Sequence, residues 1–212
     1  RKKGIRKDID ISVYIPEPGP LGVAGKEASM RVRAALDQRG IELVTAAGVT
    51  EVSRDGREAS FADGSSTSAN IIATVPVHKM PDIVADSGVA GGKPWVPVNN
   101  ATLETSTSNV FAIGDVNVVP SGDFAIPKAG VFAAGQGTKV GEVIASRINQ
   151  ADAPAPYDGI GFCFMAYSGG RSATVGGEFL AEGGPQTVLR DPTVSGMKSK
   201  DRFERDWRSF KI

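Results

Sequence analysis

The feature that most constrains the fold is a strand–helix–strand rhythm in the first 45 residues. Residues 9–15 (IDISVYI) alternate and are rich in β-branched side chains, which is typical of a strand. Residues 26–39 space their apolar side chains as a helix does, and Gly40 suits the end of that helix. Residues 41–45 (IELVT) then read as a second strand. This order predicts an α/β fold.

Composition narrows the class of partner. The chain has 212 residues, of which 41% are hydrophobic and 23% charged, enough for one large domain or two small ones. Lys and Arg number 24, as do Asp and Glu, so no overall positive charge favours nucleic acid. We therefore expect no nucleic-acid partner.

Few residues offer metal or nucleophile chemistry. A single cysteine, Cys163, excludes a disulfide within the chain. A single histidine, His78, leaves no cluster for a zinc site and no Ser-His-Asp triad, so we expect no metal. The sequence has neither an apolar run of about 18 residues nor a signal-peptide pattern. We expect a cytoplasmic protein.

The rest of the chain alternates between short elements and loops. The patterns predict, in order, a hairpin over 47–62, a turn at 63–64, a buried-type strand at 69–76, a short helix within 81–89, a short buried strand at 109–113, a helix at 129–148, a Pro/Ala linker at 151–156, strands near 161–167, 172–180 and 186–190, and a polar helix from about Lys198.

Residues 109–130 (NVFAIGDVNVVPSGDFAIPKAG) are the strongest candidate site. A buried strand that ends in Gly114-Asp115 would place a carboxylate at the sheet edge where α/β folds bind ligands. Gly114 allows close backbone approach, and Asp115 can accept hydrogen bonds from sugar-alcohol hydroxyls. Pro127 suits entry into a helix, and Lys128 would help the helix N-terminus stabilise an anionic ring edge. The structural alternative is a capping aspartate and a surface lysine.

The segment 105–115 (TSTSNVFAIGD) resembles the second FAD-binding motif of the two-dinucleotide-domain flavoproteins, the pyridine nucleotide-disulfide oxidoreductase superfamily. Pro127-Lys128-Ala129-Gly130 resembles the branch that contains sulfide:quinone oxidoreductase and flavocytochrome c sulfide dehydrogenase. The resemblance implies that Gly114 and Asp115 hold the ribityl chain of FAD. It also implies that the helix starting near Lys128–Ala129 points its N-terminus at the flavin pyrimidine edge.

Residues 157–163 (YDGIGFC) are similar to the family segment that bears the C-terminal redox cysteine. The resemblance implies that Cys163 handles sulfide sulfur beside the flavin and passes two electrons to it. The alternative is that a lone cysteine between two phenylalanines is a buried small hydrophobe.

No G-x-G-x-x-G turn is present. The glycines at 135, 137 and 141 have one residue too many and lie inside the predicted helix, which indicates close helix packing. We therefore expect the C-terminal part of a longer flavoprotein, with weak FAD affinity and little activity by itself. Its fold would be an incomplete FAD/NAD(P)-binding Rossmann-like flavoprotein fold with a β-rich C-terminal region. The expected division is 1–104 for the later part of an NAD(P)-binding-like domain, 105–150 for the closing FAD segment and 151–212 for the C-terminal region.

The resemblance predicts an FAD-dependent oxidoreductase that takes electrons from a small sulfur donor and gives them to a quinone-like acceptor. Two alternatives stay open: an NAD(P)H-oxidising flavoprotein in which Cys163 is structural, and a degenerate, non-catalytic interaction module. The tail alternates basic residues with Phe203, Trp207, Phe210 and Ile212, as in helices that lie on a membrane surface. The interleaved acids favour packing onto the same subunit, or onto a second one in a homo-oligomer.

Overall fold

The computed structural model describes residues 4–209 and divides the chain into two units, Arg1–Val77 and His78–Ile212. Each unit is treated by itself below. The three-part division predicted from the sequence stays a prediction.

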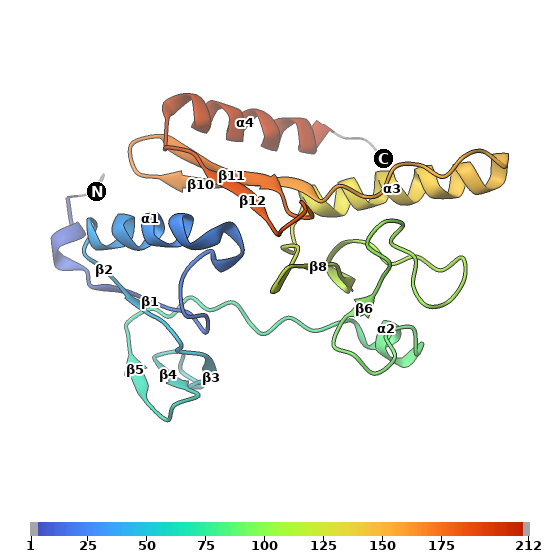
Figure 1. Cartoon of the computed structure of the whole chain (residues 1–212). Coiled ribbons are helices and arrows are strands. Elements are labelled where there is room, and N and C mark those ends of the chain that lie inside the picture. The colour runs from blue at the N-terminus through green and yellow to red at the C-terminus, as the bar shows by residue number, and fades with distance from the viewer. Residues whose placement is uncertain (1–3, 210–212) are drawn as a thin grey trace. The chain divides into compact units, whose positions relative to one another are not determined.

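The first unit opens with the expected strand–helix–strand motif (Figure 1). Strands β1 and β2 pair in parallel, with Ile11 opposite Ile41, and the helix α1 connects them. Gly40 adopts a φ of +60° just after the helix, a conformation that glycine reaches without steric cost. The bounds are η1 Arg6–Asp8, β1 Ile11–Tyr14, η2 Gly22–Ala24, α1 Gly25–Asp37 and β2 Ile41–Val44.

An antiparallel three-stranded sheet completes this unit: β3 (Val49–Val52), β4 (Glu58–Phe61) and β5 (Ser66–Ser68), in that order. It confirms the predicted hairpin. Ala47, Ala59 and Phe61 form a small buried core, and the ring of Tyr14 stacks on that of Phe61 with 4.6 Å between centroids.

The buried strand predicted at residues 69–76 is wrong. The segment has no regular secondary structure, and the side chains of Ile71 and Val75 are 86% and 78% exposed. β-Branched residues favour extended backbone, but a strand also needs a neighbour for its hydrogen bonds. Among the described residues none pairs with this segment beyond the bond from the Ala69 amide to the Arg57 carbonyl.

The second unit begins with short elements around a small core. Val96 and Leu103 are fully buried there. The strands β6 and β7 pair in parallel, and β8 with β9 makes a hairpin. The bounds are α2 Asp82–Asp86, β6 Val96–Pro97, η3 Gly114–Val116, β7 Asn117–Val118, β8 Pro120–Ser121 and β9 Phe124–Ala125.

The buried strand predicted at 109–113 is also wrong. It is reduced to one isolated antiparallel bridge between Phe111 and Glu104, and Val110 and Ile113 are 40% and 41% exposed. The turn at 106–109 folds this stretch back on residues 103–105, so only a local pairing forms.

The long helix α3 (Gly130–Asn149) follows, as predicted, and the three predicted C-terminal strands form one antiparallel sheet (Figure 1). The sheet contains β10 (Ile160–Tyr167), β11 (Arg171–Glu178) and β12 (Gln186–Leu189). The helix α4 (Val194–Ser209) begins a few residues earlier than predicted.

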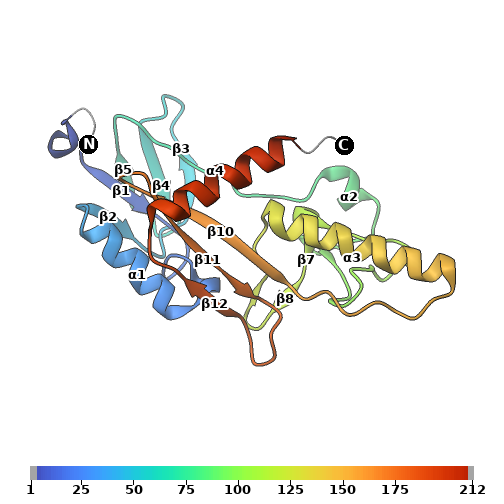
Figure 2. The same cartoon turned by 90° about the horizontal axis from the view of Figure 1, so that it is seen from above.

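The two faces of this sheet carry different partners. Figure 2 shows α4 lying along one face. On that face the ring of Phe203 contacts Phe162 and Phe164, at centroid distances of 5.6 and 5.7 Å. This contact agrees with packing of the tail onto its own subunit; Phe210 and Ile212 lie outside the described residues. The opposite face of β10 meets α3.

Residues 4–209 contain no helix that combines the length and the apolar character needed to cross a bilayer. The same residues bring together no group of three side chains able to ligate a metal ion.

Candidate functional site

The Gly114-Asp115 turn lies at the centre of the site. Gly114 has a φ of +72°, a backbone conformation that favours glycine, whereas a Cβ there would make only an ordinary contact, 3.5 Å from the Cβ of Ala133. Asp115 follows in the 3-10 turn η3 and is exposed. Its carboxylate is therefore accessible to a ligand.

A buried amide from α3 holds this turn. The Oε1 atom of Gln136 accepts hydrogen bonds from the Gly114 amide at 2.6 Å and from Asn117 Nδ2 at 3.0 Å. Asn117 Nδ2 also donates to the Ala112 carbonyl at 2.8 Å. Gln136 and Asn117 are 3% and 4% exposed, so this bond pairs the buried Oε1 atom of Gln136 with the buried Nδ2 atom of Asn117.

Lys128 binds the same turn from the other side. Its Nζ atom donates to the Asp115 carbonyl at 2.5 Å and to the Asn117 carbonyl at 2.8 Å. The ammonium also lies 3.6 Å from the centre of the Trp95 ring, in a cation–π contact. Burial lowers the pKa of Lys128, and the nearby charge of Asp115 opposes that shift. The lysine thus braces the turn rather than extending into solvent.

The start of α3 lies beside the braced turn. The helix begins at Gly130, and its N-cap residue Ala129 provides no side-chain hydrogen bond, which leaves the first N–H groups for another acceptor. Pro127 lies two residues before the N-cap, so it does not occupy the first helical position. One small pocket joins these parts; its lining comprises Gly114, Asp115, Asn117, Ile126, Pro127, Lys128, Ala129, Phe132, Ala133 and Gln136.

The strand that carries Cys163 packs on the same end of α3. Gly161 lies against the Phe132 ring so closely that a Cβ at Gly161 would come within 2.1 Å of a ring carbon. Cys163 is two residues further along β10 and hence on the same face of the sheet. Cys163 is exposed and forms no disulfide. The neighbouring side chains partly desolvate the thiol and raise its pKa.

Tyr157 supports the helix behind this pocket. Its ring lies against Gly135, and its hydroxyl is buried with no hydrogen-bond partner in the part of the chain that the structure describes. Burial, with the charge of Asp158, raises the pKa of Tyr157 to about 12, against a smaller lowering effect of the Gln136 side chain. The phenol is therefore neutral at physiological pH.

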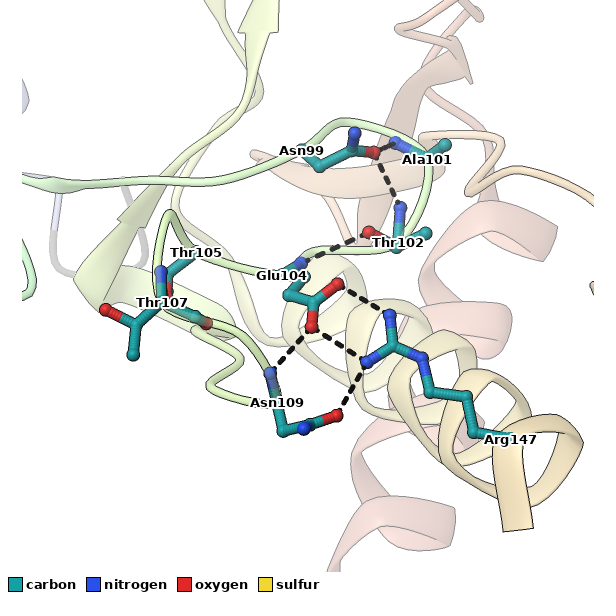
Figure 3. Close-up of polar contacts among 8 residues, drawn as sticks. All are labelled: Asn99, Ala101, Thr102, Glu104, Thr105, Thr107, Asn109 and Arg147. Atoms are coloured by element: carbon teal, nitrogen blue, oxygen red, sulfur yellow. Dashed lines mark hydrogen bonds and ion pairs between the residues drawn. The ribbon is translucent and has the colours of Figure 1, made fainter.

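A second polar cluster fixes the far end of α3. Arg147 forms two parallel hydrogen bonds to the Glu104 carboxylate, at 2.7 and 2.6 Å, and a third to the Asn109 side chain (Figure 3). The Asn109 amide also donates to Glu104 at 2.7 Å. These bonds to Arg147 and Asn109 hold the pKa of Glu104 at about 2. The cluster anchors the loop that leads to Gly114.

The structure thus brings five of the six predicted cofactor residues, 114–115 and 127–129, into the lining of one pocket, while Gly130 begins the adjacent helix without lining it. Cys163 does not line that pocket, although its strand packs on the same helix. Sequence reasoning missed Trp95, Asn117 and Gln136. Gln136 carried a signal, because it is a polar residue on the buried face of α3 that Phe132 and Val143 define.

Comparison with known proteins places this geometry among flavoenzyme folds. A family model described as pyridine nucleotide-disulphide oxidoreductase matches residues 8–147. The chain is similar to the structure of a sulfide:quinone oxidoreductase from Aquifex aeolicus, with a TM-score of 0.78 and 22% identity over 96% of this chain and 50% of that one.

Two other solved structures share the fold. An NAD-dependent persulfide reductase from A. fulgidus matches with a TM-score of 0.55 and 20% identity, over 80% of this chain and 32% of that one. A chain in a mitochondrial ATP synthase assembly from Tetrahymena thermophila matches with a TM-score of 0.65 and 19% identity, over 80% of this chain and 40% of that one. The chain thus spans half or less of the length of each of these proteins.

Proposed function

Because the chain belongs to the pyridine nucleotide-disulphide oxidoreductase family, we propose that it supplies part of the FAD site of an oxidoreductase that resembles sulfide:quinone oxidoreductase. In this proposal two electrons pass from a sulfur species, through Cys163 and FAD, to a quinone-like acceptor. The observation that carries the proposal is the single pocket that joins the Gly114-Asp115 turn to the uncapped start of α3.

The residues present fit the ribityl end of FAD. The Asp115 carboxylate is exposed and makes no hydrogen bond to other described residues, so its oxygens can accept from ribityl hydroxyls. The left-handed backbone of Gly114, without a Cβ, lets the chain approach the cofactor closely. Gly114 and Asp115 would therefore hold the sugar alcohol.

The start of α3 fits the ring end. Its first turn contains no acidic side chain and no side-chain cap, so the partial positive charge of the helix is not neutralised locally. The N–H groups near Gly130 would bind the pyrimidine edge, and Lys128 would keep the turn and the helix start together. When bound, FAD supplies the capacity to accept two electrons.

Cys163 would bind the sulfur of the donor: a sulfur–sulfur bond would form, the protons of both sulfurs would leave to solvent, and the two electrons released would be accepted by FAD. A thiol must lose its proton to become a nucleophile, and the raised pKa of Cys163 leaves a smaller thiolate fraction at neutral pH than an ordinary thiol has. We therefore expect the step that uses Cys163 to accelerate as the pH rises through the alkaline range.

The test is anaerobic reduction of the flavin by sulfide in the full-length protein, followed by stopped-flow absorbance. Wild type should be reduced by sulfide, Cys163→Ser should slow this step by about two orders of magnitude or more, and Asp115→Asn should weaken flavin binding. Asp123→Asn, an exposed acid in the β8–β9 turn, is the matched control and should change neither. A colourless wild-type protein that takes up no FAD would contradict the proposal.

The raised pKa of Cys163 also favours a second function, an NAD(P)H-oxidising flavoprotein in which this cysteine has no catalytic role. The likeness to an NAD-dependent persulfide reductase supports it at the level of the fold. Flavin reduction by NADH but not by sulfide, unaffected by Cys163→Ser, would select this function.

The likeness to a chain of an ATP synthase assembly supports a third function, an interaction module without catalysis. In that case Asp115→Asn would alter no flavin signal, because there would be none. The proposal also includes a macromolecular partner, either a second subunit or a membrane surface. Measuring the binding of the chain to itself and to lipid vesicles would test it.

A further inference from the structure

We propose that Gln136 is the positioning residue that sets the Gly114-Asp115 turn for the flavin. The effect on flavin binding rests on the proposed function, whereas the hydrogen bonds of Gln136 are contacts within this chain. Gln136 contacts the turn from 22 positions further along the chain.

Gln136 supplies the acceptor for the backbone amide of Gly114. The left-handed φ of Gly114 points its amide into the protein, where Gln136 Oε1 accepts it at 2.6 Å. Without that oxygen the amide would lose its partner in a partly buried setting, a loss that costs up to about 1–3 kcal/mol. The turn would then relax, and the direction of the Asp115 side chain with it.

The same oxygen links the two halves of the pocket. It also accepts from Asn117 Nδ2, and the carbonyl of Asn117 accepts from Lys128. Lys128 in turn precedes the start of α3. These two hydrogen bonds therefore connect the interior of α3, through Asn117, to the residue that lies two positions before the helix start.

An apolar side chain would serve helix packing better than glutamine at this position. Gln136 is 3% exposed on the face that otherwise buries Phe132 and Val143. Burying an amide is unfavourable unless its polar atoms are paired, and here the pairing goes to the functional turn rather than to another helix. Positioning of the turn accounts for the polar residue.

The first test measures amide hydrogen exchange of the 212-residue chain, without flavin. Gln136→Met keeps the volume but removes the acceptor, and Gly114 should exchange about tenfold faster or more. Gln136→Glu keeps an acceptor oxygen and should restore the protection. Val143→Ala, a buried change on the same helix face, should leave Gly114 exchange at the wild-type rate in native conditions. Equal Gly114 exchange in wild type and Gln136→Met would overturn the inference.

If Gln136→Met does not fold, Gln136→Asn tests the same loss of the acceptor for the Gly114 amide. It keeps the amide but withdraws the oxygen by one methylene, so Gly114 should again lose protection. Wild-type protection of Gly114 in Gln136→Asn would overturn the inference.

The second test uses the flavin-loaded full-length protein. Gln136→Met should weaken FAD binding by about tenfold and shift the visible circular dichroism of the bound flavin, with Gln136→Glu recovering the affinity. A merely structural role would lower the melting temperature without changing the flavin spectrum, as Val143→Ala should. If wild type binds no flavin, the proposed function fails while the exchange result stands; if wild type binds flavin and Gln136→Met binds it equally with an unchanged spectrum, the inference fails and the function stands.

Discussion

The helices α1 and α3 begin alike but differ in what surrounds the first turn. Neither has a side-chain cap: the N-cap residue is Ala24 in α1 and Ala129 in α3. In α1 the acid Glu27 lies in the first turn, and the space around Gly25 is open. In α3 the first turn has no acid, and a network of buried hydrogen bonds lies beside it.

The difference shows what turns a helix start into a candidate site. A carboxylate in the first turn already offsets the positive end of the helix, as Glu27 does in α1. The start of α3 keeps its partial charge for an external acceptor, and Gln136 and Lys128 hold Asp115 next to it. An uncapped helix alone would therefore not identify the site.

Removing the ring that joins α3 to β10 should have the largest effect. Phe132 is 2% exposed and contacts Phe179 edge-on with 5.0 Å between centroids. Phe132→Ala should lower the free energy of unfolding by about 4 kcal/mol. The matched change in α1, Ala28→Gly, should cost about 1 kcal/mol.

Urea unfolding separates these two effects. Trp95 and Trp207, the two tryptophans of the chain, belong to the second unit, so their fluorescence reports Phe132→Ala, while circular dichroism reports Ala28→Gly. If Phe132→Ala lowered the free energy of unfolding by less than Ala28→Gly does, Phe132 would not join α3 to the sheet.

Overpacking the same junction should have an intermediate effect. Gly161→Ala places a methyl group against Phe132 and should cost about 2 kcal/mol. In the Phe132→Ala background the methyl fills the cavity, so the two changes together should cost less than their sum by about 1 kcal/mol. Purely additive losses would show that Gly161 and Phe132 are not in contact. Gly25→Ala at α1 meets no neighbour and costs only the strain of its φ of +86°, about 1 kcal/mol.

The Glu104–Arg147 pair should give α3 a pH dependence. The pKa of Glu104 falls from 4.5 to about 2 on folding, so its stabilisation is complete above pH 4.5 and is lost as the pH falls toward about 2. Glu104→Gln should flatten the urea midpoint against pH in that window. Arg147→Lys keeps the charge but not the two parallel bonds, and should lose part of the slope. An unchanged slope in both variants would exclude the pair as its source.

The sequence predicted local elements better than their partners. The strand–helix–strand motif, the hairpin at 47–62, α3 and the C-terminal strands follow from periodicity, turns and glycines close to the residues concerned. The strands predicted at 69–76 and 109–113 failed because their apolar residues need a neighbouring strand. Apolar residues such as Ile71 and Ile113 do not indicate whether a neighbouring strand is present to pair with them.

The site was predictable in part for the same reason. Asp115 and Lys128 stand out because they interrupt apolar patterns next to glycine and proline. Gln136 and Trp95 act through contacts with residues far along the chain, which local pattern does not contain. The role of Gln136 depends on the left-handed turn at Gly114, whose amide donates to it, and that of Trp95 on its contact with Lys128.

The smallest effect on stability should come from Asp115. Its carboxylate is exposed and bonds to no described residue, so Asp115→Asn should change the free energy of unfolding by about 0.5 kcal/mol or less. FAD binding by the full-length protein should nevertheless weaken by about tenfold, because the amide is a poorer acceptor for ribityl hydroxyls. Glu27→Gln, the matched change at α1, should affect neither quantity beyond about 0.5 kcal/mol. Urea unfolding checks the claim about stability, and isothermal titration with FAD checks the claim about affinity. Equal flavin affinities for Asp115→Asn and Glu27→Gln would mean that the two helix starts do not differ as binding sites, and that the hydrogen bonds beside α3 serve the fold alone.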